Sequence, residues 1–250
     1  MTKAAEAVIR DWNSRLGGTI SLRIDLTAHA ASEGFEHFGT MLTQYAPAVV
    51  LEKRRDASER LPAIHVFKNL VYHVIPLQQE LQPFLDLLEC IDSRNESVYG
   101  QLLQPIRDIA YPAELKIYIT PVCPHCPKTV RDIAPLPLFN PLLKVSIIDG
   151  TMFPEMAQED DIRSAPTVLL SDAIRWSGEC PLDEIIDKLH NRDTPDLGPS
   201  AIQSIIEDGG ADRLVAMMTA AGHIFPACYK LLFSEKWSVR LGVMVAFETL

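Results

Sequence analysis

The chain of 250 residues has few cysteines, no long uncharged apolar run and no excess of basic residues. Five cysteines are too few for a small secreted fold held together by disulfides. Charges interrupt the amino terminus, and no run of about 18 uncharged apolar residues occurs, so we expect neither a signal peptide nor a membrane span, and hence a cytoplasmic protein. The formal net charge of −10, without a basic stripe, makes nucleic acid and anionic membranes poor partners.

The order of predicted elements repeats once along the chain. A hydrophobic content of 47% is enough for more than one core. Two successive stretches each read as helix, strand, helix, strand, proline, hairpin and helix, with Pro62 and Pro166 in equivalent places. This repeat predicts two tandem α/β domains, over residues 1–97 and 98–192.

Hydrophobic periodicity predicts the individual elements. Alternation from Ile20 to Leu26 and the apolar run 49–51 predict strands in the first half, and the run 115–120 predicts one in the second. A helix is expected over residues 77–91, with Pro83 tolerable only in its first turn, and another over about 98–109. Two hairpins are expected, one of residues 64–67 with 71–75, the other of residues 168–170 with 173–176.

The last part of the chain has a different, purely helical pattern. Beyond a linker at residues 193–199, apolar residues recur at helical spacing and predict about four short helices in an all-α segment, residues 193–250. The stretch Trp237–Met244 resembles a HEAT-type helical array, which needs at least about three repeats to bury its faces. The chain ends inside an apolar helix, which raises the expectation that it is part of a longer protein.

The strongest functional signal is the run Cys123-Pro124-His125-Cys126, which follows a predicted buried strand. Pro124 and Pro127 suit the first turn of a helix that begins at residue 124. Two thiols separated by two residues at a helix start can pass two electrons through a reversible disulfide. The alternative is a zinc site, but zinc needs about four ligands and no second pair is visible at the right spacing. We therefore expect neither a metal nor another cofactor.

Four stretches carry a resemblance to a known family: Cys123–Lys128, Ile148–Pro154, Ile162–Thr167 and Gly178 before the last helix of the second half. The second half resembles the N-terminal domain of the flavoprotein subunit of bacterial alkyl hydroperoxide reductase, and also the glutaredoxin-like protein disulfide oxidoreductases. Both are tandem thioredoxin folds. The resemblance implies two thioredoxin-like domains followed by the small helical segment.

The same resemblance bears on where the active thiols and cis prolines lie. In the reductase the first fold is thiol-free, which matches residues 30–33 here, whereas the disulfide oxidoreductases often carry a dithiol in both halves. A thioredoxin-type domain places a cis proline beside its dithiol, so we expect Pro166, and by the repeat Pro62, to follow a cis bond. The flavin and nicotinamide domains of the reductase have no counterpart after residue 192.

Each residue of the motif has an expected role. Cys123 is the attacking thiolate, because helix N-terminal amides and the His125 imidazole favour negative charge on its sulfur, with Pro124 and His125 tuning that thiolate. Cys126 is the resolving thiol. A partner strand is expected to bind along the backbone at Ala165, Pro166 and Thr167.

The remaining candidate groups have expected roles outside catalysis. The strand before the motif offers no obvious buried proton acceptor, since Glu114 near its start is expected to be solvated. Cys180 is expected to be a partly exposed bystander, and Cys90 and Cys228 buried small hydrophobes.

Two functional hypotheses follow. The first is a thiol-disulfide oxidoreductase that exchanges electrons with protein disulfides; the resemblance implies a flavoprotein reductase and a peroxiredoxin as its partners. The second is a non-enzymatic adaptor, in which the thiol-free half and the helical tail bind partners and the dithiol senses the redox state.

Overall fold

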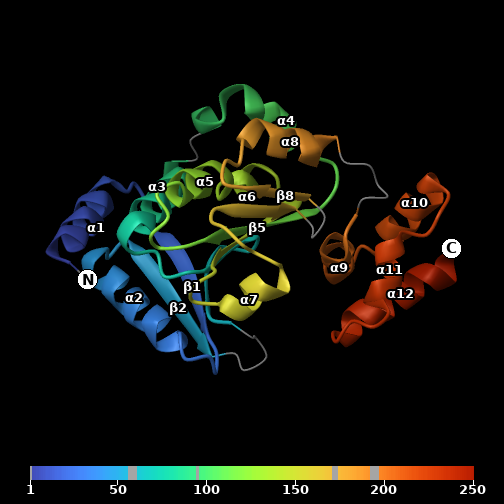
Figure 1. The fold of residues 1–250 in the computed structure, drawn as a ribbon, viewed down its shortest axis with the longest axis horizontal. Helices are drawn as coiled ribbons and strands as arrows, with labels where there is room; N and C mark the ends of the chain where they lie inside the picture. Colours follow the sequence, from blue (N-terminus) through green and yellow to red (C-terminus); the bar gives the residue numbers. More distant parts are fainter. Residues whose placement is uncertain (1, 56–60, 94–95, 171–173, 192–196) are drawn as a thin grey trace.

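The computed structural model describes residues 2–55, 61–93, 96–170, 174–191 and 197–250 (Figure 1). Within these ranges, eight strands form one continuous mixed sheet. From edge to edge its order is β2 (Val49–Arg55), β1 (Ile20–Leu26), β3 (Ala63–Phe67), β4 (Leu70–His73), β6 (Leu143–Asp149), β5 (Ala113–Ile119), β7 (Thr167–Leu170) and β8 (Ile174–Ser177).

Strand pairing in the second half of the sheet repeats that of the first. β1 pairs in parallel with β2 and antiparallel with β3, which pairs antiparallel with β4. In the same way β5 pairs in parallel with β6 and antiparallel with β7, which pairs antiparallel with β8. A parallel pairing of β4 with β6 joins the two sets. Because both sets share one sheet, the division into separate domains at residue 97 stays a prediction.

Side-chain alternation explains the central strands but not the edge. In β1, Ile20, Leu22 and Ile24 are buried and Ser21 is exposed, as the alternation predicts. β2 extends to Arg55, beyond the apolar run 49–51, because its charged second half pairs with β1 through the backbone, which requires no apolar side chain. Of the predicted second hairpin, residue 173 lies outside the described residues.

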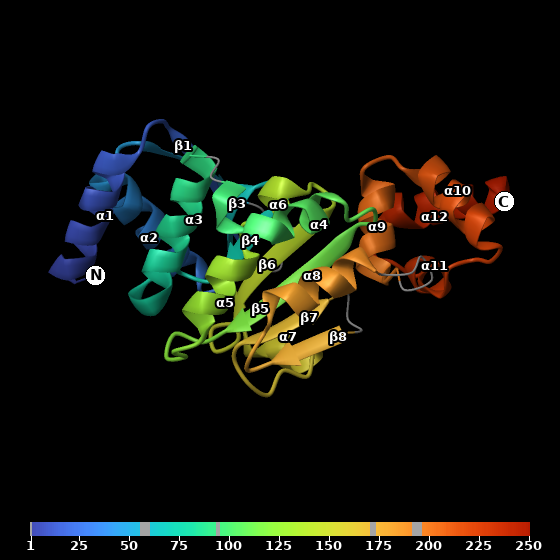
Figure 2. The ribbon, with the colours of Figure 1, turned by 90° about the horizontal axis from the view of Figure 1, so that it is seen from above.

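Helices cover both faces of this sheet. α5, α6 and α8 lie on one side and α7 on the other (Figure 1), and Figure 2 shows α1, α3 and α5 in succession along the sheet. None of the described helices has the length and apolar composition needed to cross a membrane. Their bounds are α1 (Lys3–Arg15), α2 (Ser32–Tyr45), α3 (Leu81–Ser93), α4 (Leu103–Arg107), α5 (Cys126–Ile133), α6 (Leu136–Phe139), α7 (Pro154–Glu159) and α8 (Leu182–His190), with short 3-10 turns η1 (Gln78–Glu80), η2 (Glu96–Val98) and η3 (Gly100–Leu102).

Two helix predictions have different outcomes. α3 begins at Leu81, so Pro83 lies in its first turn, as that prediction required. The continuous helix predicted over 98–109 is wrong: the described backbone there consists of the turns η2 and η3 and the short α4. Gly100, with a φ of 50°, adopts the left-handed conformation that interrupts helix, which explains the break.

The chain after residue 196 forms a separate helical cluster, with α9 (Pro199–Glu207), α10 (Ala211–Ala221), α11 (Pro226–Leu231) and α12 (Trp237–Thr249). Its buried residues form their own apolar core, apart from the core that both halves of the sheet share. Polar contacts to the sheet include Lys68 Nζ with Asp208 Oδ1 at 2.8 Å and Arg213 with the Ala110 carbonyl at 3.1 Å. The HEAT-type arrangement of these helices stays a prediction.

Asn140 connects the two chain segments that lead into β5 and β6. Its Nδ2 donates to the carbonyl oxygens of Ile106 and Ile109, each at 2.9 Å, and its Oδ1 accepts the Leu142 N–H at 2.9 Å. Asn140 is buried, so these backbone groups have no access to bulk water. One side chain thereby positions the approach to β5, the strand that leads to the cysteine motif.

Replacing Asn140 with Leu should lower the free energy of unfolding by about 2–4 kcal/mol, because it leaves buried carbonyl groups without a hydrogen-bond donor. Urea denaturation measures this. The exposed Asn191→Leu, which removes surface bonds to Asp187 and His190, should change it by less than about 0.5 kcal/mol. Equal effects at both positions would contradict the assignment.

Candidate active site

The cysteine motif lies between the end of β5 and the start of α5. The Cys123 N–H donates to the Thr120 carbonyl at 3.1 Å, which closes a turn directly after β5. Cys126 is the first residue of α5, with His125 as its N-cap and Pro127 in the first turn. The helix therefore starts two residues later than predicted, because Pro124 and His125 belong to the turn.

Cys123 and Cys126 form a disulfide, with Cα atoms 5.5 Å apart. The Cys126 N–H, at the amino end of α5, points at the Cys123 sulfur at 3.1 Å. Cys123 is 7% exposed and Cys126 is fully buried, so of the two residues only Cys123 keeps any contact with solvent. In the reduced state, the same amide and the helix dipole favour a thiolate at Cys123.

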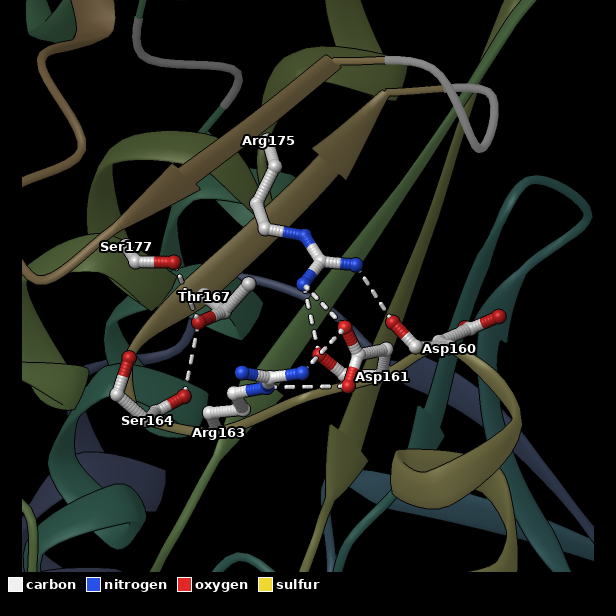
Figure 3. Close-up of polar contacts among 7 residues, drawn as sticks. All are labelled: Asp160, Asp161, Arg163, Ser164, Thr167, Arg175 and Ser177. Atoms are coloured by element: carbon white, nitrogen blue, oxygen red, sulfur yellow. Dashed lines mark hydrogen bonds and ion pairs between the residues drawn. The ribbon is translucent and has the colours of Figure 1, made fainter.

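The loop before Pro166 faces this disulfide. The Ala165–Pro166 peptide bond is cis, and the Ala165 carbonyl oxygen lies 3.4 Å from the Cys123 sulfur. Thr167 Oγ1 donates to the Ser164 carbonyl at 2.8 Å and lies 3.2 Å from Ser177 Oγ (Figure 3). The bond before Pro62 is not among the cis bonds of the described backbone, so the expectation for Pro62 is wrong. The repeated order of elements does not extend to this peptide bond.

Two arginines hold the same loop in position, Arg163 within it and Arg175 on β8. The Arg175 guanidinium on β8 donates to the carbonyl oxygens of Asp160 and Asp161, each at 2.7 Å. Arg163 forms a two-point ion pair with the Asp161 carboxylate, at 3.1 and 3.3 Å (Figure 3). The chain between α7 and Pro166 is thus held against β8 without any contribution from the cysteines. This anchoring presets the position of Ala165 opposite Cys123.

Pro124 and His125 lie on the solvent side of the turn. Both are exposed, and the His125 side chain makes no capping hydrogen bond to α5. Their role in tuning the Cys123 thiolate stays a prediction.

A buried carboxyl group that the sequence analysis missed faces α5 from the thiol-free half. Glu80 in η1 is 3% exposed, and within the described part of the chain neither of its carboxyl oxygens has a hydrogen-bond partner. Burial raises the pKa of Glu80 from its ordinary 4.5 to about 7; Arg131 on α5 opposes the rise and Asp149 adds to it. η1 lies against α5, so this acid belongs to the surroundings of the dithiol.

A signal for Glu80 exists in the sequence. Glu80 stands three residues after Leu77 and four before Phe84, at the spacing of one apolar helix face. Glu114, on the strand before the motif, forms an ion pair with Lys144 at 3.0 Å.

The other cysteines do not join the site. Cys90, Cys180 and Cys228 lie outside the disulfide and are buried, so the expectation that Cys180 is partly exposed is wrong. Burial raises the pKa of each thiol, that of Cys228 to about 11. Among the described residues, no three His, Cys, Asp or Glu side chains are grouped so as to hold a metal ion.

Comparison with known proteins agrees with this geometry. Residues 113–191 match the family described as a thioredoxin domain. The chain is 24% identical over 232 residues to a protein named NADH dehydrogenase from Ferdinandcohnia aciditolerans, covering 91% of this chain and 42% of that protein. It is 23% identical over 146 residues to the F subunit of alkyl hydroperoxide reductase from Xanthomonas campestris pv. phaseoli, covering 56% and 28%. The chain spans less than half the length of these curated relatives.

Solved structures share the fold. The NTD_N/C domain of alkylhydroperoxide reductase AhpF from Enterococcus faecalis superposes with a TM-score of 0.67 at 19% identity, covering 76% of this chain and 99% of that domain. A protein disulfide oxidoreductase from Aeropyrum pernix superposes with a TM-score of 0.69 at 13% identity, covering 76% and 92%.

The fold and the bonded cysteine pair are those of a thioredoxin-fold dithiol protein, and the segment 113–191 is the part that matches the thioredoxin domain family. The two likenesses expected from the motifs, to the reductase domain and to the disulfide oxidoreductases, are confirmed at the level of the fold.

Burial of Glu80 makes the stability of the oxidised protein depend on pH. The folded carboxyl keeps its proton up to about pH 7, whereas the unfolded one loses it near 4.5, so the free energy of unfolding should fall as the pH rises between these values. We expect a fall of about 2–3 kcal/mol that is absent in Glu80→Gln. Urea denaturation of both proteins across this range measures the difference, and parallel curves would count against a buried acid.

Proposed function

We propose that this protein passes electrons through the Cys123/Cys126 pair to or from the disulfides of partner proteins. The observation that carries the proposal is the asymmetry of the pair: Cys123, whose sulfur lies beside the Ala165 carbonyl, keeps some exposure to solvent, and Cys126 has none. Exchange requires one thiol that meets the partner and a second that resolves the intermediate.

The exchange runs in two displacements. The Cys123 thiolate attacks one sulfur of the partner disulfide, which forms a mixed disulfide and releases a partner thiolate. The Cys126 thiol then loses its proton and attacks the Cys123 sulfur, which closes the internal disulfide and releases the second partner thiolate. Two electrons have moved to the partner, whose two thiolates then take up protons from water, and the reverse sequence oxidises a partner dithiol.

Glu80 is the proton acceptor for Cys126 in this proposal. Cys126 is fully buried and needs a nearby base, because water does not reach its sulfur. A carboxyl with a pKa of about 7 is suited to take up a proton near neutral pH. The two unsatisfied oxygens of Glu80 can accept the hydrogen bond that the transfer requires.

Ala165, Pro166 and Thr167 form the backbone along which a partner strand binds. The Ala165 carbonyl lies beside Cys123, and the side-chain bonds of Thr167 hold the segment in place. A strand paired there brings its own sulfur to the exposed end of the internal disulfide.

A flavoprotein reductase and a peroxiredoxin are the partner classes that we propose. The names of the relatives, an NADH dehydrogenase and the F subunit of alkyl hydroperoxide reductase, support such a chain of electron carriers. A cytoplasmic location and a division into two thioredoxin-like domains complete the proposal.

Reduction of insulin by dithiothreitol tests the activity. The protein should accelerate it, and Cys123→Ser, Cys126→Ser should return the rate to the background. Cys180→Ser, which alters a buried thiol outside the site, should keep full activity.

This experiment also separates the enzyme from an adaptor that only senses the redox state. An adaptor would show no acceleration with either the wild type or the double variant, and that result would refute the oxidoreductase.

Loss of the Glu80 carboxyl should slow the resolving step. When the reduced protein is mixed with an aromatic disulfide reagent, the second thiol should be released more slowly in Glu80→Gln, by roughly tenfold or more above pH 7. The wild-type rate should rise with pH through about 7, as the carboxyl loses its proton, and the variant should lack that inflection. Glu114→Gln, whose carboxyl pairs with Lys144, should behave as the wild type; an unchanged profile in Glu80→Gln would remove this role.

A further inference from the structure

A groove opens between the amino-terminal ends of α1 and α3. It has a volume of about 600 Å³, and its apolar walls are Ala5 and Val8 from α1 and Leu77 and Leu81 from η1 and α3. Of the described residues that line it, none carries a charge, although the chain as a whole has a net charge of −10. Val8 is 39% exposed at its rim.

The groove and the dithiol share one edge of the molecule. α1 contacts α3, and α3 and η1 contact α5. Figure 2 shows these three helices side by side, with their amino-terminal ends toward the same edge. The dithiol occupies that end of α5, and the groove occupies that end of α1 and α3.

η1 physically links the two features. Leu77 and Gln78 line the groove, and Glu80, two residues further, is buried toward α5. Gln78 has a φ of 54°, a left-handed conformation that non-glycine residues seldom adopt. With this turn, residues 77–80 contact both the groove and α5.

We propose that this groove binds an uncharged, apolar segment of the protein disulfide on which the dithiol acts. The proposal rests on the function proposed above and adds the class of partner. Helices pack about 8–10 Å apart, so the groove lies roughly 15 Å from Cys123. An extended chain advances about 3.3 Å per residue, which places the apolar segment about five residues from the partner's reactive cysteine.

The described residues that line the groove carry no charge, and this determines which kind of partner segment binds there. An acidic or basic segment would lose hydration there without meeting an opposite charge, whereas Leu, Val or Ala side chains would bury apolar surface. The polar groups at the rim, such as Gln78 and Gln82, can bond to the backbone of the bound segment.

Two synthetic peptides test this directly. Each holds one intramolecular disulfide; one carries Leu and Val at the fourth to sixth positions beyond a cysteine, and the other carries Ser there. Reduced protein converts the peptide disulfide to two thiols and is itself oxidised to the Cys123–Cys126 disulfide, and dithiothreitol returns it to the dithiol. We expect a KM about tenfold lower for the apolar peptide, with similar kcat.

Val8→Glu should abolish this preference, so that the two peptides have similar KM values. Val50→Glu makes the same change at another exposed valine, on the edge strand β2, and should retain the preference. Equal KM values for the two peptides in the wild type, or a preference that survives Val8→Glu, would overturn the groove. No turnover of either peptide would instead refute the oxidoreductase itself, and the groove with it.

Discussion

The parallel pairing of β4 with β6 is the contact on which the site depends. It joins the thiol-free half to the dithiol half in one sheet, with Leu70–His73 in register with Val145–Ile148. The helical layer then continues across the junction, where Arg131 Nε on α5 meets Asp86 on α3 at 2.7 Å. Without this pairing, η1 would not lie against α5 and Glu80 would be an exposed surface acid.

The thiol-free half therefore contributes chemistry as well as structure. A buried carboxyl in a low-dielectric layer keeps its proton to a higher pH than one in water, because desolvation disfavours the charged form. In this protein Glu80 belongs to the thiol-free half, is buried where η1 contacts α5, and under the proposed function accepts a proton from the dithiol of the other half. A half without cysteines can in this way be part of an active site.

Local patterns in the sequence were enough for the motif and for most strands. Cys123 and Cys126 stand at the junction of a strand and a helix as predicted, and both hairpins lie where the alternation indicated, apart from the residues outside the described ranges. Two of the predictions that failed concern the surroundings of a residue, whereas the helix predicted over 98–109 failed locally, at Gly100. Whether the bond before Pro62 is cis, and whether Cys180 is buried, depends on neighbours that come from distant parts of the chain.

The dithiol, its place before a helix and the repeated order of elements can be predicted from the amino-acid sequence, because residue spacing and hydrophobic periodicity are patterns over a few residues. Tertiary packing, in contrast, explains why Glu80 is buried where η1 contacts α5, why Cys126 is less exposed than Cys123, and why a groove with no charged side chain among its described residues lies between α1 and α3. Those properties arise because segments that are dozens of residues apart in sequence pack together and exclude water. This packing requires the sheet that joins the two halves.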